Sequence, residues 1–331
     1  MRRTREGRAL PSKKHVALRS DAILYLPRQR SKIMEYEKTN AFQSIWKHLF
    51  RTPHRMSWID VDGVSTRYLE AGAPDAPPLL LLHGTAGSLE NFSANYAAYA
   101  EDFRVIGLDL LGCGLTDKPD FDYLIPDYVD HVLGFMNAMG IESASLVGVS
   151  LGSWVSAALA YAHPARVVSL AMVSPAGIIT DPDEERRVAE SIRARRTQAA
   201  QTPTWETIAA AMRSLVLHPD TMIDDVIAIR LDIYSDPAMK AAMPHLLAFT
   251  GGKDAMNPEQ WRNLIQPVLV VAAIDSPNMF LTNARAIAEL TPRAQLLELA
   301  GCDHWAQFEQ AERFNSATID FFRKQYQARC S

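Results

Sequence analysis

The strongest structural signal in the sequence lies at residues 144–161, which read Ala-Ser-Leu-Val-Gly-Val-Ser-Leu-Gly-Ser-Trp-Val-Ser-Ala-Ala-Leu-Ala-Tyr. Its apolar run, Leu146 to Val149, predicts a buried strand, and the alanine-rich run from Val155 to Tyr161 predicts a helix. Between them, Gly148-Val149-Ser150-Leu151-Gly152 places a serine on a tight turn from strand to helix. Glycines two residues to either side are needed there, because a Cβ would crowd the neighbouring strand and helix.

Such a turn holds the Ser150 hydroxyl over the edge of the sheet, where the amino terminus of the following helix favours developing negative charge. The five-residue pattern alone occurs often by chance and would carry no function. The strand before it and the helix after it favour a nucleophile. Because a serine hydroxyl is a weak nucleophile at its own pKa, a base is required, and we expect it late in the chain.

His304 is the predicted base. It lies in Gly301-Cys302-Asp303-His304-Trp305, directly after the apolar run from Leu296 to Leu299. Eight other histidines compete, and most are expected on the surface or in the core. His83 is the main rival, but it ends a strand and opens a loop better suited to donating backbone N–H groups.

Two backbone amides are predicted to face a developing oxyanion. They are the amides of Thr85, in the loop after His83, and of Leu151, the residue after the candidate nucleophile.

Short apolar runs alternate with helix-like stretches through the first half of the chain, at 79–82, 105–108, 146–149 and 167–173. Continuous rather than alternating apolar strands indicate burial on both faces, hence a parallel sheet covered by helices. Asp62-Gly63 predicts a two-residue hairpin turn before them. A helix is predicted over 128–139, ending at Gly140.

The alternation stops after Val173, gives way to helix-like segments from Asp183 to Thr250, and resumes at 268–273. A helical insertion between two strands of one sheet is expected to form a cap over the carboxyl edge, where ligands bind. The predicted organisation is therefore an extension at 1–36, a core at 37–176 and 267–331, and a cap at 177–266.

The 331 residues are 48% hydrophobic and 22% charged, which excludes a disordered or fibrous chain. The formal charge is −4, yet residues 1–55 carry fourteen Lys and Arg against four Asp and Glu. That start is interpreted as a solvated extension, with a transit-like leader or an over-long start upstream of Met34 left open. Its basic residues are not interleaved with aromatics, which disfavours nucleic-acid binding.

Three cysteines without paired spacing favour neither a disulfide framework nor a zinc site. Neither a membrane-length apolar run nor the apolar run of a secretory signal is present, so the sequence predicts a cytoplasmic protein. No metal or organic cofactor is expected. The predicted partner is a small-molecule substrate, without nucleic acid or membrane; homo-oligomer formation is left open.

Four motifs together resemble the α/β-hydrolase superfamily: His83-Gly84, Asp109 to Gly114, the serine turn at 148–152, and Gly301 to Phe308. Within it, the chain is most similar to the meta-cleavage product hydrolases, which hydrolyse carbon–carbon bonds in vinylogous diketo acids. The resemblance extends from about residue 38 to 325. It implies a mostly parallel central sheet flanked by helices, with an inserted helical cap.

The resemblance also implies roles for single residues. Ser150 would act as nucleophile or as general base toward water, and His304 as proton shuttle. The substrate would be contacted by four further residues: Arg230 pairing with its carboxylate, Asn91 near the dienoate end, Trp305 beside the acyl pocket, and Gly84. From the residues alone, Arg230 fits a solvated position on a cap helix equally well.

Three positions depart from that family's pattern. Thr85 and Ala86 stand where its oxyanion loop is glycine-rich, and Val149 stands where asparagine is frequent. The substrate class is therefore less well defined than the mechanism.

The orienting acid of the superfamily follows the strand predicted at 268–273, where it fixes the histidine tautomer. Here that position falls on Ser276, with Asp275 one residue earlier. In a strand, a shift of one residue would turn the side chain to the opposite face of the sheet. A loop can accommodate such a shift, so Asp275 is the predicted acid. The alternatives are that Asp181 orients the histidine or that the orienting acid is missing. Asp303 is interpreted as a loop-stabilising residue, because adjacent side chains seldom face each other.

The leading hypothesis is a serine-type hydrolase acting on a small, largely apolar carbonyl compound, with a ring-fission keto acid as the predicted substrate. An ester or lactone is the alternative within the same mechanism. A weakly catalytic or non-catalytic binding protein is the alternative of another class, because of the displaced acid.

Overall fold

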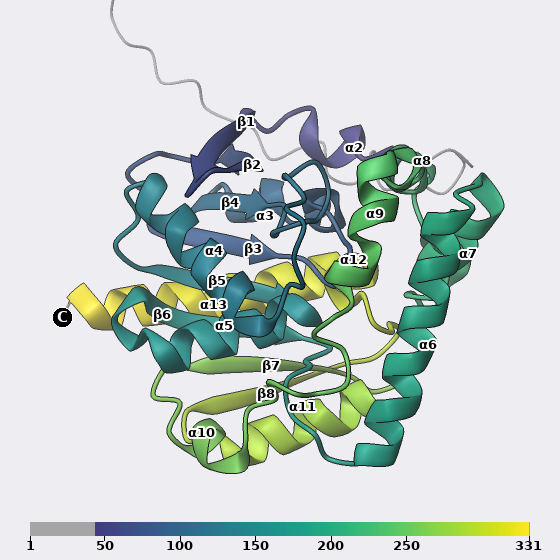
Figure 1. Ribbon diagram of the computed structural model, residues 1–331. Coiled ribbons are helices and arrows are strands. Elements are labelled where there is room, and N and C mark those ends of the chain that lie inside the picture. Colours follow the sequence, from purple (N-terminus) through teal and green to yellow (C-terminus); the bar gives the residue numbers. More distant parts are fainter. Residues whose placement is uncertain (1–43, 331) are drawn as a thin grey trace, which may run out of the picture. The chain divides into compact units, whose positions relative to one another are not determined.

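The computed structural model describes residues 44–330, which form a single eight-stranded sheet in the order β1-β2-β4-β3-β5-β6-β7-β8 (Figure 1). The strands are β1 (His54–Val61), β2 (Val64–Ala71), β3 (Pro78–Leu82), β4 (Arg104–Leu108), β5 (Ala144–Val149), β6 (Val167–Val173), β7 (Val268–Ala273) and β8 (Ala294–Leu299). The strand β2 runs antiparallel to β1 and β4, and every other pair of neighbouring strands is parallel. The predicted mostly parallel α/β sheet is confirmed. The predicted extension at 1–36 lies outside the described residues.

Helices cover both faces of the sheet (Figure 1). One side carries α4 (Ile125–Ala138), α5 (Leu151–Ala162) and α11 (Met279–Leu290), and the other carries α3 (Tyr96–Tyr99) and α13 (Ala311–Cys330). Shorter elements are α2 (Trp46–Leu49), α12 (Ala306–Glu309), η1 (Leu89–Phe92) and η2 (Pro164–Arg166). Because both faces are covered, every residue of β5 and β6 is buried, which explains their uninterrupted apolar sequences.

The predicted hairpin turn and the predicted end of a helix at Gly140 are both confirmed. Asp62 and Gly63, with φ of 51° and 88°, join β1 to β2, and two consecutive positive φ angles are typical of the tight hairpin turn that Asp-Gly favours. Gly140, with φ of 65°, follows the end of α4.

Between β6 and β7 the chain forms α6 (Pro182–Gln201), α7 (Trp205–Arg213), η3 (Pro219–Thr221), α8 (Asp224–Ser235), α9 (Pro237–Leu246) and α10 (Pro258–Arg262). The helices α6 to α9 pack against one another at one end of the sheet, while α10 packs against α11 (Figure 1). Within the described residues, no helix is long and apolar enough to cross a membrane.

Backbone hydrogen bonds attach this helical insertion to the segment that carries His304. The Trp305 amide donates to the Leu215 carbonyl at 3.0 Å, and the Glu309 carboxylate accepts from the Leu217 and His218 amides. These hydrogen bonds fix the position of the helical insertion relative to the segment that carries the candidate base.

A buried group of charges fixes the loops after β3 and β4. Arg67 on β2 donates to Asp109 at 2.6 Å and to Glu90 in η1 at 3.0 Å, and all three side chains are buried. Asp109 also accepts from the Leu89 amide at 2.8 Å. Since buried charges are tolerated when paired and hydrogen-bonded, this group fixes the position of η1, which carries Asn91.

Candidate active site

Ser150 occupies a strained turn between β5 and α5. Its φ of 55° and ψ of −113° lie in a region that L residues rarely adopt, at a cost on the order of 1–3 kcal/mol. A hydrogen bond from the Ser150 amide to the Val173 carbonyl, 3.0 Å long, attaches the turn to the end of β6. Ser150 is 8% exposed and lines a cavity of about 250 Å³.

The two glycines that flank Ser150 are required by close packing, as the sequence predicts. A Cβ on Gly148 would lie 2.4 Å from the Gly152 carbonyl carbon. One on Gly152 would lie 2.0 Å from the Leu82 carbonyl oxygen on β3. The strand, the turn and the helix therefore approach each other more closely than any side chain permits.

His83 is fully buried and both of its ring nitrogens are engaged. Nε2 accepts from the Leu110 amide at 3.1 Å, which leaves the proton on Nδ1, and Nδ1 donates to the Gly84 carbonyl at 2.8 Å. Burial lowers the pKa of His83 to about 3. It is a neutral residue that shapes the loop after β3 and is not available as a base.

That loop lies against the candidate nucleophile. A Cβ on Gly84 would be 3.4 Å from the Ser150 Cβ, and Thr85 lines the same cavity. Neither the Thr85 amide nor that of Leu151, the first residue of α5, donates to an acceptor within residues 44–330. Two uncommitted donors beside a serine are what an oxyanion hole requires.

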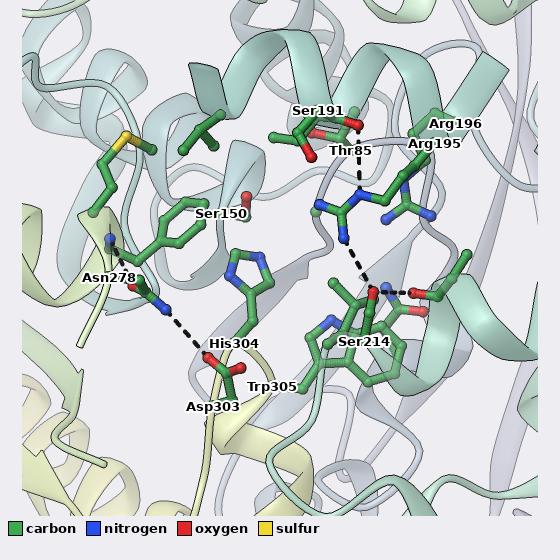
Figure 2. A pocket seen from close by; sticks show the side chains of 18 of the residues that line it. Thr85, Ser150, Ser191, Arg195, Arg196, Ser214, Asn278, Asp303, His304 and Trp305 are labelled. Carbon is green, nitrogen blue, oxygen red and sulfur yellow. Dashed lines mark hydrogen bonds between the residues drawn. The ribbon is translucent and has the colours of Figure 1, made fainter. Parts of the chain in front are cut away.

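His304 lines the cavity opposite this loop, and Figure 2 shows its imidazole turned toward the Ser150 side chain. The ring packs edge-on against Phe280 with centroids 4.4 Å apart, and the His304 carbonyl accepts from the Ser174 hydroxyl at 2.9 Å. Burial, followed by the positive charges of Arg196 and Arg195, lowers the pKa of His304 to about 3. The imidazole is therefore neutral, as a base must be before it takes a proton.

The structure does not bring Asp275 to His304, in contrast to the sequence-based expectation. Asp275 is exposed, and its carboxylate accepts from the Gly301 amide at 2.7 Å instead of facing the cavity. The loop after β7 does not absorb the slip of one residue. Ser276, the next residue, is the one that turns toward the His304 loop, where its hydroxyl donates to Asp303.

No other carboxylate takes the place of Asp275 in the described part of the chain. Asp181, the alternative acid, caps α6 by accepting from the Asp183 and Glu184 amides. The Asp303 carboxylate accepts from the Ser276 hydroxyl and, at 3.3 Å, from the side-chain amide of Asn278. These hydrogen bonds join the loop after β7 to the loop that carries His304 (Figure 2). This stabilising role is the one predicted for Asp303. Among residues 44–330, no acid is hydrogen-bonded to the His304 ring.

Arg230 and Asn91 are brought together although 139 residues separate them. The Arg230 Nη2 donates to the Asn91 Oδ1 at 3.0 Å, and Nη1 donates to the Ala86 carbonyl at 2.8 Å. Arg230 is only 2% exposed and lines the cavity, and its Nε has no partner. It is thus a buried cation rather than a solvated cap residue. Trp305, also predicted at the site, is buried and lines the same cavity.

One wall of the cavity comes from α6 and was not anticipated from the sequence. It is formed by Glu184, Val188, Ser191, Ile192, Arg195 and Arg196. Their spacing of three to four residues places them on one face of the helix, which is a detectable signal. The helix is so polar that this face resembles a solvated one, and nothing in the sequence marks it as facing a cavity.

Residues 77–311 match the family described as alpha/beta hydrolase fold. A 2-hydroxy-6-oxononadienedioate/2-hydroxy-6-oxononatrienedioate hydrolase of Paraburkholderia phymatum is 30% identical over 260 residues, 73% of this chain and 86% of that protein. A 2-hydroxy-6-oxo-6-(2'-aminophenyl)hexa-2,4-dienoic acid hydrolase of Metapseudomonas resinovorans is 27% identical over 81% of this chain and 90% of its own length. The crystal structure of a meta-cleavage product hydrolase from Pseudomonas fluorescens IP01 superimposes with a TM-score of 0.70 at 25% identity, covering 81% of this chain and 97% of that one.

The position of Asp275 leads to a first prediction. Asp275→Asn is expected to change turnover of a nitrophenyl ester by no more than about twofold, because the only hydrogen bond of the carboxylate within residues 44–330 comes from the Gly301 amide. The asparagine side-chain oxygen can still accept from the Gly301 amide, so the free energy of unfolding is expected to fall by less than about 1 kcal/mol. If Asp275 were the orienting acid, turnover would fall by about 10⁴. Steady-state kinetics and urea unfolding on the same preparation separate the two effects.

The charges around His304 lead to a second prediction, for kcat/KM of an uncharged nitrophenyl ester as a function of pH. Because the pKa of His304 is lowered to about 3, the base stays neutral as the pH falls from 8 to 5, and kcat/KM is expected to remain level. Arg196→Gln removes one cause of the lowering, so its acidic limb should move to higher pH.

Circular dichroism at each pH verifies that both proteins remain folded. An acidic limb near 6.5 in the unmodified protein, or no movement in the variant, would contradict this account of the site.

Proposed function

Because the chain belongs to the alpha/beta hydrolase fold family, we propose that it hydrolyses a carbon–carbon bond in a small, largely apolar ring-fission keto acid, with Ser150 and His304 as its catalytic residues. The named relatives that act on 2-hydroxy-6-oxo-dienoic acids support this substrate class. Within the chain itself, one observation carries the proposal: the environment of Arg230.

The Arg230 guanidinium is a buried cation that makes no ion pair with a carboxylate within residues 44–330. Its hydrogen bonds go to a carbonyl and an amide oxygen, and its Nε is unpaired. An uncompensated buried charge costs several kcal/mol, and burial accordingly lowers the pKa of Arg230. A substrate carboxylate entering the cavity would supply the missing negative charge through charge-assisted hydrogen bonds.

The reacting carbonyl would then lie between Ser150 and the two uncommitted amides. The oxygen nucleophile is the Ser150 hydroxyl, or a water molecule that Ser150 activates, and the His304 imidazole takes the proton. Negative charge that develops on the carbonyl oxygen is stabilised by the Thr85 and Leu151 amides. As the carbon–carbon bond breaks, its electron pair passes into the conjugated chain, and His304 returns the proton to the leaving dienolate. Where the Ser150 hydroxyl itself has attacked, a water molecule then hydrolyses the resulting acyl-enzyme ester, and His304 takes and returns its proton.

Carboxylic ester or lactone hydrolysis is the alternative use of the same groups, since none of them except Arg230 is specific for a keto acid. The alternative from a different class of function is a protein that binds the small molecule but catalyses its reaction weakly or not at all. It is favoured by one observation, that no carboxylate in the described residues orients His304.

We further propose a cytoplasmic protein with a small-molecule substrate and without nucleic-acid or membrane partners. Two observations are compatible with a reducing compartment. Cys113 and Cys302 are buried free thiols, and burial raises the pKa of each to about 12.

The substrate class is tested with a coloured 2-hydroxy-6-oxo-dienoate and a series of nitrophenyl esters. We expect a higher kcat/KM for the dienoate, and a hundredfold preference for the esters would contradict the proposal. Arg230→Gln is expected to lower kcat/KM for the dienoate by about 10- to 100-fold, because it removes hydrogen bonds to a charged group. Its effect on an uncharged ester should be small.

Arg187→Gln is the matched control for that experiment. Arg187 is an exposed cap arginine on α6 that does not line the cavity, so its replacement makes the same change in charge away from the site. It should leave both substrates unaffected.

A further inference from the structure

Hydrogen bonds fix the backbone around His304 but not the angle of its ring. The Asp303 amide donates to the Glu309 carboxylate at 2.9 Å, and the Ser174 hydroxyl donates to the His304 carbonyl at 2.9 Å. In a catalytic triad the acid sets the ring angle, because it accepts a hydrogen bond from the imidazole. Since no acid among residues 44–330 does so here, packing must keep the imidazole turned toward Ser150.

Phe280, in the first turn of α11, is the aromatic residue that packs against the His304 ring. The ring centroids are 4.4 Å apart and the ring planes meet at 67°, an edge-to-face arrangement that aromatic pairs favour. It is the closest pair of aromatic rings within residues 44–330. Both side chains line the cavity. At this separation the imidazole cannot turn away from its position without losing the contact.

Asn278 holds Phe280 in place through the backbone. It is the N-cap residue of α11, and its Oδ1 accepts from the Phe280 amide at 2.9 Å. Its Nδ2 donates to the Ser276 hydroxyl at 2.9 Å and to the Asp303 carboxylate at 3.3 Å (Figure 2). One side-chain amide therefore joins the start of α11 to the loop that carries His304.

These hydrogen bonds lie where the superfamily has its orienting acid. Ser276 stands at that position in the sequence, and its hydroxyl donates to Asp303. The loop after β7 thus presents the phenyl ring of Phe280 to the imidazole, and not a carboxylate.

We propose that Phe280 is the positioning residue of His304: its ring keeps the imidazole turned toward Ser150, and Asn278 keeps Phe280 in place. Because Ser150 and His304 are the catalytic pair of the proposed function, this role rests on that function. A phenyl ring restricts the imidazole by contact alone. It therefore supplies the orienting part of what an acid does, and not the stabilisation of the imidazolium.

The charges that face the cavity belong to other residues. They are Glu184, Arg195 and Arg196 on α6, Arg230 on α8, and Asp303. The positive charges of Arg196 and Arg195 contribute to the low pKa of His304. A substitution at position 280 leaves all of them unchanged, so a change in pH dependence would report the lost contact with the ring.

The test measures the rate at which a fluorophosphonate labels Ser150 between pH 5 and 8, which requires no keto acid. In Phe280→Leu we expect labelling to be at least about tenfold slower, because the imidazole is no longer confined to the orientation that reaches the hydroxyl. The acidic limb of the rate should also move to higher pH, since water reaches the imidazole and favours its charged form.

Phe280→Tyr keeps the ring and is the conservative variant. Phe280 is half-buried, so the added hydroxyl can remain in water, and the rate should stay within about twofold of the unmodified protein. Asn278→Ser keeps an oxygen that can cap α11 but loses both donors, so its rate should lie between those of Phe280→Leu and the unmodified protein.

Phe121→Leu is the matched control. Phe121 is exposed, packs against Tyr123 and does not line the cavity, so the same change of side chain there should leave the rate and its pH dependence unaltered. Circular dichroism verifies that each variant is folded.

Three results would overturn the positioning role. They are an unchanged rate and limb in Phe280→Leu, an equal loss in Phe280→Leu and Phe280→Tyr, and a failure of Ser150 to be labelled in the unmodified protein. The second result would indicate that the shape of the cavity, and not contact with the ring, is what matters at position 280.

Turnover of the coloured dienoate by the unmodified protein separates this role from the function on which it rests. Labelling that depends on Phe280 as expected, without cleavage of the dienoate, would support the positioning role and contradict carbon–carbon hydrolysis. Cleavage of the dienoate, with labelling that does not depend on Phe280, would do the reverse.

Discussion

The close approach of β3, β5 and α5 around Ser150 is the constraint on which the site depends. The Cβ of any residue at 148 or 152 would overlap backbone atoms, so the two glycines allow the chain to turn within one residue. The backbone of Ser150 is strained as a result, and packing of the buried strand β5 keeps it in that conformation. The hydroxyl is thus placed by the packing of the sheet and not by its own hydrogen bonds.

Other parts of the site are fixed in relation to that turn. His83 hydrogen-bonds the Gly84 carbonyl and the Leu110 amide, which holds the loop bearing Thr85 against the serine. The ion group around Arg67 holds η1, and through it Asn91. The backbone contact between Trp305 and Leu215 couples the helical insertion to the His304 segment. Binding and catalytic groups therefore come from elements whose relative positions are set by buried contacts.

The sheet, the hairpin and the serine turn could be predicted because each has a local cause: uninterrupted apolar runs, an Asp-Gly pair, and glycines at fixed spacing. The orienting acid could not, because the direction of a loop side chain after β7 depends on the loop's own hydrogen bonds. There the Gly301 amide donates a hydrogen bond to Asp275, and the Ser276 hydroxyl donates one to Asp303. Arg195 and Arg196 were missed for a different reason. A polar helix has the same sequence pattern whether one face meets solvent or a cavity.

Covalent labelling measures whether the strained Ser150 hydroxyl is activated by His304. The protein is incubated with a fluorophosphonate, and the adduct is located by peptide mass mapping. We expect a single adduct on Ser150, with a labelling rate at least a hundredfold lower in His304→Ala. An adduct on another residue, or an unchanged rate in His304→Ala, would contradict activation of Ser150 by His304.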